Sequence, residues 1–155
     1  MKKLFVTTFL SAILISCSNE QVSEKEGSCF SNGTSTYQWT MVTTWPKNFP
    51  GLGLAPENFS KYIEEMTCGR MKIKVYGAGE FVPAMGVFDA VSQGNVQLGH
   101  GASYYWTGKV KSSQFFTAVP FGLTAQEMNG WLHYGGGLEL WQEAYEPFNL
   151  IPLAQ

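Results

Sequence analysis

Short runs of strand-forming residues alternate with helical patterns along most of this chain. The segment 37–45 is rich in Tyr, Trp, Thr and Val and predicts a strand, and 71–76 and 96–101 predict two more. Helical patterns lie between them. Such alternation favours a parallel-rich sheet flanked by helices. The sequence therefore predicts an α/β fold.

Proline and glycine set the limits of the first predicted helix. Pro56 is placed in its first turn, and Gly69 ends it. Phe59, Ile63 and Met66 recur at helical spacing and predict one buried stripe. This helix would connect the first two strands of the sheet.

The same signals define a second helix, which begins at Pro83 and ends at Gly94. Thr124 and Glu127 form a capping box that predicts the start of a third helix. A fourth helix is expected over 138–148, after a run of three glycines.

Two further strands are expected in the C-terminal third of the chain. One covers 114–123, where Phe, Thr and Val are frequent, and the other covers 149–154. Together with the helices they would complete one small domain from residue 37 to residue 155.

The first residues have the pattern of an export signal. Two lysines precede an apolar stretch that is too short to span a bilayer comfortably, and it ends in Leu-Ile-Ser-Cys, which resembles a bacterial lipobox. We expect 1–16 to be a lipoprotein signal peptide, Cys17 to carry the lipid, and 17–36 to be a flexible tether. The expected location is the periplasm, with a lipid anchor to the membrane. The alternative is an ordinary secretory signal with a chance cysteine.

Charge and cysteine content exclude several classes of protein. Without residues 1–16 the chain has 8 basic and 12 acidic residues, because the removed segment holds two of the 10 basic residues and no acid. That net charge of −4 and the scattered lysines argue against nucleic-acid binding. With two histidines and no zinc-like cysteine spacing, no metal cluster is expected within the chain. An oxidising compartment would permit a Cys29–Cys68 disulfide.

Aromatic residues and glycines gather where the predicted strands end. In parallel sheets the carboxyl ends of the strands share one edge, and ligands bind in the crevice there. Aromatic faces supply contact area, hydroxyls orient a ligand, and glycine lets the backbone approach it. The candidate ligand-binding residues are Trp45, Gly79, Phe81, Tyr104 and Tyr105.

Each candidate also has a purely structural interpretation. Trp45 could pack in the core, one of Tyr104 and Tyr105 is expected to face it, and Gly79 could serve its turn alone. His100 has no serine or acid partner in the sequence and is interpreted as structural. The stretch GAGEFV at 77–82 lacks the third glycine of a dinucleotide fingerprint, which argues against nucleotide binding.

Three stretches resemble one family of transport proteins. They are TTWPKNFPGLG, GAGEFVPAMGVFDAVSQGNVQLGHGASYYWTGK and AVPFGLTAQEMNGWLHYGGGLELWQE. They are similar to the solute-binding proteins of tripartite ATP-independent periplasmic (TRAP) transporters, in the branch that binds 2-oxoacids and related monocarboxylates. The resemblance covers nearly all of 37–155 and implies a periplasmic-binding-protein-like lobe.

The resemblance implies that a small organic carboxylate is trapped between two lobes and delivered to a membrane permease, often together with sodium or another cation. Trp45 would be the pocket aromatic, and Tyr104 or Tyr105 would offer a hydroxyl to the ligand. The second lobe of the family supplies the carboxylate-binding arginine and the cation ligands, and this sequence does not contain it. We therefore expect the N-terminal part of such a protein, which would form a homodimer in its full-length state.

The predicted function is that of a non-enzymatic solute-binding component of a TRAP transporter. The alternative is a fragment of an exported α/β enzyme that acts on a small organic acid. Such an enzyme should place a nucleophile with a base, or a pair of carboxylates, in the strand-end turns. Glu80 is the one acid there, and this favours binding without catalysis.

Overall fold

The structure is a computed structural model that describes residues 35–154. The chain divides into two units, Met1–Phe30 and Ser31–Gln155, and the second contains every described residue. The predicted signal peptide, Cys17 and most of the predicted tether lie outside the described residues. Among the helices of the described part, none has the length and apolar character needed to cross a membrane.

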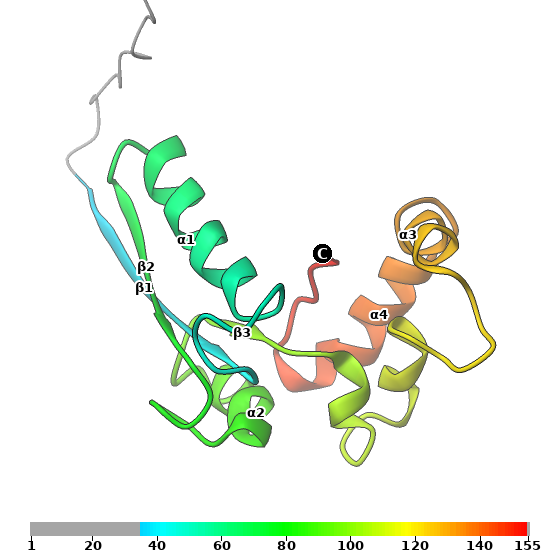
Figure 1. Ribbon diagram of the computed structural model, residues 1–155. Coiled ribbons are helices and arrows are strands. Elements are labelled where there is room, and N and C mark those ends of the chain that lie inside the picture. The colour runs from blue at the N-terminus through cyan, green and yellow to red at the C-terminus, as the bar shows by residue number, and fades with distance from the viewer. Residues whose placement is uncertain (1–34, 155) are drawn as a thin grey trace, which may run out of the picture. The chain divides into compact units, whose positions relative to one another are not determined.

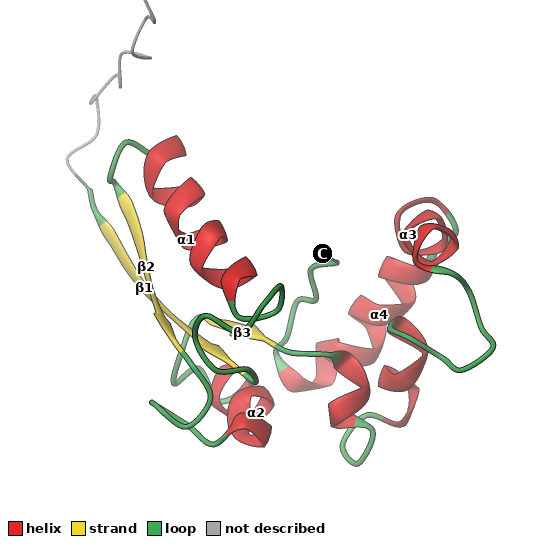
Figure 2. Cartoon of the chain, in the orientation of Figure 1, coloured by secondary structure: helices red, strands yellow, loops and turns green. Residues whose placement is uncertain are grey.

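Three parallel strands form the sheet. They are β1 (Tyr37–Thr43), β2 (Met71–Tyr76) and β3 (Leu98–His100), and β1 lies in the middle (Figures 1 and 2). Met41 is opposite Val75 on one side and Leu98 on the other. Because both pairings are parallel, the three carboxyl ends lie at one edge. The predicted α/β fold with a parallel sheet is confirmed.

The first helix, α1 (Leu54–Met66), packs against β2 as the sequence pattern predicts, except at its end. Phe59 and Ile63 are partly buried, whereas Met66 is 79% exposed. The prediction of a buried Met66 is wrong because the helix stops there. Thr67 instead makes the contact with the next strand.

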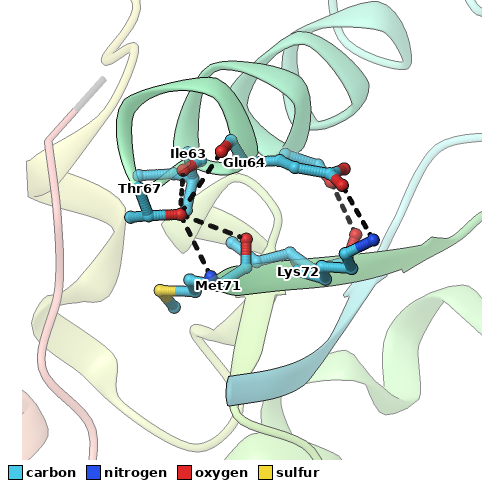
Figure 3. A network of polar contacts seen from close by, with 7 residues as sticks. Ile63, Glu64, Thr67, Met71 and Lys72 are labelled. Carbon is cyan, nitrogen blue, oxygen red and sulfur yellow. Dashed lines mark hydrogen bonds and ion pairs between the residues drawn. The ribbon is translucent and has the colours of Figure 1, made fainter. Parts of the chain in front are cut away.

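Thr67 forms the joint between α1 and β2, which Figure 3 shows from close by. Its hydroxyl donates to the Ile63 carbonyl at 2.7 Å and accepts from the Met71 backbone N–H at 3.0 Å. Lys72 and Glu64 form an exposed ion pair beside it, 3.1 Å apart. One side chain thus satisfies a helix end and a strand start together.

The predicted second helix is a short 3-10 turn, Ala84–Gly86, followed by α2 (Val87–Ser92). Val87 and Phe88 of this helix are buried. Gly99 of β3 allows close contact with this helix, because a Cβ atom there would lie 2.8 Å from Val91 Cγ2 and 2.9 Å from Val87 Cγ1. The absence of a side chain at Gly99 therefore sets the helix–strand distance.

The predicted strand over 114–123 is wrong. Lys111–Phe116 forms a 3-10 helix instead. Val110, Ser113 and Phe116 are 7%, 0% and 5% exposed, so burial recurs every third residue, which is the period of a 3-10 helix. Phe116 also stacks between Trp131 and Trp141, at ring distances of 6.0 and 5.4 Å. These contacts between distant segments override the strand propensity of the sequence.

The predicted strand over 149–154 is also wrong. These residues adopt no strand structure, and Leu150 packs against the core while Pro152 is buried. Asn149 has φ 56°, a left-handed conformation that turns the chain at the start of the segment. This turn and the packing of Leu150 hold the segment outside the sheet.

Two helices precede that segment, α3 (Ala125–Tyr134) and α4 (Gly137–Tyr145). They are separated by a sharp turn in which Gly136 has φ 83°. The predicted capping box is confirmed: Glu127 N–H donates to Thr124 Oγ1, and Thr124 N–H donates to Glu127 Oε2 at 2.8 Å. A 3-10 turn, Glu146–Phe148, follows α4.

Replacing Thr124 by Ala is expected to lower the free energy of unfolding by about 1 kcal/mol, because the cap of α3 is lost. Urea denaturation measures the change. Gln126→Ala, an exposed position in the same helical turn, is the control and should have a smaller effect. An equal loss of unfolding free energy in the two variants would contradict a stabilising role for the Thr124 cap.

One hydrophobic core joins the sheet to α2 and α4. The Phe88 ring contacts Trp106 and Tyr145, each at 5.7 Å, and the Ser92 hydroxyl donates to the Phe148 carbonyl at 2.7 Å. The buried members of the core are Val42, Val87, Phe88, Ala90, Val96, Trp106, Val110 and Tyr145. This core lies directly beneath the strand ends and fixes their position.

Candidate functional site

Aromatic rings gather at the carboxyl ends of β1 and β3. The Trp45 ring lies 4.9 Å from the His100 ring and 6.1 Å from the Tyr105 ring, measured between centroids. Tyr104 contacts Tyr105 edge to face at 4.7 Å. These four residues, Trp45, His100, Tyr104 and Tyr105, form what we call the strand-end wall.

Trp45 belongs to the strand-end wall rather than to the buried core. Its side chain is partly exposed, and its backbone is held on both sides of the residue. Trp45 N–H donates to Thr43 Oγ1 at 3.1 Å, and the Trp45 carbonyl accepts from Ala78 N–H at 3.0 Å. The β1 and β2 ends are therefore joined through the backbone of Trp45.

The three consecutive aromatics of Ser103–Trp106, a 3-10 turn, divide between core and surface. Trp106 is 5% exposed and belongs to the core, whereas Tyr104 is 41% exposed. Tyr105 is partly buried, with its ring on the wall. Hydrogen bonding to Tyr105, together with partial burial, raises the pKa of Tyr104 above its ordinary value, so the two tyrosine hydroxyls are paired with each other.

The Ser103–Trp106 turn is anchored from two sides. The buried Ser103 hydroxyl donates to the Ser113 carbonyl at 2.7 Å. Just after the turn, Lys109 Nζ contacts both carboxylate oxygens of Asp89 at 2.7 and 2.8 Å. Lys109 is exposed, and its ion pair with Asp89 links the segment after the turn to α2.

His100 belongs to the wall through its imidazole, a position that the sequence interpretation of His100 as structural did not include. Its carbonyl accepts from Thr44 N–H at 3.0 Å, which ties β3 to the end of β1. At the next residue, Gly101, a Cβ atom would lie 2.9 Å from Thr44 Cγ2 and 3.1 Å from Trp106 Cζ2. The glycine beside His100 is the sequence signal for this close packing.

Gly79 and Phe81 lie in the neighbouring turn after β2. Gly79 is exposed and has φ 81°, so the left-handed conformation of the turn explains this glycine. Phe81 is 51% exposed, and its ring contacts Tyr76 at 5.2 Å. This turn is joined to the wall by the hydrogen bond from Ala78 N–H to the Trp45 carbonyl. The ring of Phe81, however, packs on Tyr76 and not on the wall residues.

Glu80 organises this turn electrostatically. Its Oε2 atom lies 2.9 Å from Lys47 Nζ and accepts from Gly77 N–H at 2.9 Å. Both contacts hold the pKa of the Glu80 carboxyl below its usual range, and the bond with Lys47 has the larger effect. The carboxylate is ionised at neutral pH and is already paired.

Two hollows lie away from the wall, beside Lys111–Phe116, α3 and α4. Their volumes are about 470 and 240 Å³, and Phe115 and Trp131 line both. Their surfaces are mostly apolar, and they do not include any predicted site residue. Among residues 35–154 no group of three or more His, Cys, Asp or Glu side chains is placed to hold a metal ion.

Residues 41–154 match the family model of the bacterial extracellular solute-binding proteins, family 7. The chain belongs to this family. A relative from Nostoc, described as the monocarboxylate 2-oxoacid-binding periplasmic protein all3028, is 43% identical over 138 residues. That alignment covers 89% of this chain and 36% of the relative.

Solved structures of family members share the fold. A TRAP periplasmic solute-binding protein from Pseudoalteromonas atlantica, with bound sodium and pyruvate, is 44% identical and has a TM-score of 0.73. One from Colwellia psychrerythraea, with bound calcium and pyruvate, is 42% identical and has the same TM-score of 0.73. Each comparison covers 76% of this chain and 36% of the solved chain. This chain therefore spans about a third of the length of its relatives.

Proposed function

We propose that this chain is the N-terminal part of a TRAP-transporter solute-binding protein that captures a small 2-oxoacid, of which pyruvate is the simplest candidate. The observation that carries the proposal is the strand-end wall. Trp45, His100 and Tyr105 meet at the sheet edge where α/β folds bind ligands, and two solved relatives at 44% and 42% identity hold pyruvate.

The chemistry of the wall fits such a ligand. Flat aromatic faces can contact the short carbon chain, and the hydrogen-bonded pair of Tyr104 and Tyr105 hydroxyls leaves one O–H to donate to a carbonyl or carboxylate oxygen. The Glu80 carboxylate is neutralised by Lys47, so it does not repel an anion as a lone acid would. The wall itself supplies area and orientation, and we assign the charge that binds the carboxylate to the remainder of the protein.

A cation accompanies the ligand in our proposal, because the pyruvate-bound relatives hold sodium or calcium. Its ligands would come mostly from the part that the relatives have beyond this chain. We further propose a periplasmic location, lipid anchoring through Cys17, delivery of the solute to TRAP permease subunits, and a homodimer of the full-length protein. The role is binding for transport rather than catalysis.

Calorimetric titration of the product of the complete reading frame tests the proposal. Pyruvate should bind saturably with sodium or calcium present, and more weakly after the cations are chelated or replaced. Acetate, which lacks the 2-oxo group, is the control ligand. Absence of pyruvate binding under every cation condition would overturn the proposal, as would consumption of pyruvate followed by NMR.

A further inference from the structure

Lys47 and Glu80 connect the turn after β1 to the turn after β2. Their charged atoms are 2.9 Å apart, and the two side chains are 40% and 44% exposed. An exposed ion pair contributes little to folding. The position of this pair, however, lies between two turns that carry candidate site residues.

The Glu80 carboxylate also closes its own turn. The oxygen that contacts Lys47 accepts from Gly77 N–H at 2.9 Å, and Glu80 N–H donates to the Gly77 carbonyl at 3.1 Å. At Gly77 a Cβ atom would lie 2.9 Å from the Lys47 backbone nitrogen. The two turns are therefore in backbone contact, and the ion pair fastens them at that contact.

The fastened turns hold the backbone of Trp45. Ala78, next to Gly77, donates its N–H to the Trp45 carbonyl at 3.0 Å. Trp45 and Lys47 flank Pro46 in the turn after β1. The turn after β2 therefore contacts this turn on both sides of Pro46, at Trp45 through Ala78 and at Lys47 through Glu80. The indole ring extends from this segment onto the His100 ring, 4.9 Å away.

We propose that Lys47 and Glu80 are positioning residues that set the orientation of the Trp45 ring in the strand-end wall. The effect of this positioning on ligand affinity rests on the proposed function. Binding groups act well only when they are held within about 0.5 Å of the productive geometry. Loss of the pair therefore weakens binding more than it weakens folding.

The state of the pair at neutral pH agrees with this role. The Lys47 ammonium and the Gly77 N–H both favour the charged carboxyl, so the pKa of Glu80 is lowered. The connection is present at neutral pH and is lost as the pH falls through that lowered pKa. Lys47 and Lys74 also lie over the Tyr76 ring, at 6.0 and 4.9 Å, so the neighbouring charges are cationic.

The test uses Lys47→Met, which keeps the apolar stem and removes the charge, and Glu80→Gln. Lys72→Met is the matched control, because Lys72 at the start of β2 forms a similarly exposed pair with Glu64 of α1. The product of the complete reading frame is labelled with fluorotryptophan, and the Trp45 signal is assigned with Trp45→Phe. The fluorine spectrum, melting temperature and pyruvate affinity are measured for each variant.

We expect Lys47→Met and Glu80→Gln to shift or broaden the Trp45 signal and to raise the pyruvate Kd by about tenfold. Their melting temperatures should stay close to that of Lys72→Met. Combining the two substitutions should add little to either alone, since both remove one interaction. Lys47→Arg, which keeps the charge, should restore the signal and most of the affinity.

Two results would overturn the inference. One is a Trp45 signal that does not differ between Lys47→Met and Lys72→Met. The other is a drop in melting temperature that accounts for the whole loss of affinity, which would make the role structural. If the signal moves as expected while the unmodified protein binds no pyruvate, the positioning role is supported and the proposed function fails.

Discussion

Replacing Trp106 by Ala is expected to lower the free energy of unfolding by about 3–5 kcal/mol. Trp106 is 5% exposed, its ring contacts Phe88 at 5.7 Å, and it belongs to the buried core beneath the strand ends. Truncation removes a large apolar area and leaves a cavity that the neighbouring helix cannot fill. Urea denaturation followed by circular dichroism measures the loss.

Tyr104→Ala, from the same 3-10 turn, is the control for this prediction. Tyr104 is 41% exposed, so its loss should cost less than about 1 kcal/mol. A similar destabilisation by both variants would mean that the turn does not divide its aromatics between core and surface.

Removing the two tyrosine rings of the wall together is expected to abolish stabilisation by 2-oxoacids. In Tyr104→Ala/Tyr105→Ala, pyruvate loses aromatic contact area and a hydroxyl donor, and Trp45 loses its ring contact with Tyr105 at 6.1 Å. We expect pyruvate affinity to fall by at least about thirtyfold, or about 2 kcal/mol. The rise in melting temperature on adding pyruvate measures this loss in the product of the complete reading frame.

Leu140→Ala is the comparison for the double variant. Leu140 is 53% exposed and lines the larger hollow, away from the wall. It should retain the full ligand-induced rise. If Leu140→Ala loses the response while the double tyrosine variant keeps it, the ligand binds in the hollow and the assignment of the wall is wrong.

The parts of the fold that depend on local signals could be predicted from sequence. The strands at β1 and β2 and the capping box of Thr124 and Glu127 each follow from residues close together in the chain. The segments 114–123 and 149–154 could not be assigned in this way. In the first, Phe116 takes its conformation from stacking on Trp131 and Trp141, which are distant in sequence.

The sequence could predict at which edge of the sheet the candidate site lies, but not how its side chains are arranged there. Parallel strands bring their carboxyl ends to one edge, so Trp45 and Tyr105 were expected near each other, and their rings are in contact. The 3-10 turn Ser103–Trp106 decides which of its three aromatic residues enters the core, and it places Trp106 there. The pairing of Lys47 with Glu80 depends on the fold of two turns and has no local signature.

The most direct test of the proposed function is a crystal structure of the product of the complete reading frame with pyruvate and sodium. We predict density for pyruvate against the strand-end wall, within contact distance of the Trp45 and Tyr105 side chains. Pyruvate bound elsewhere, with both side chains facing solvent, would contradict the account.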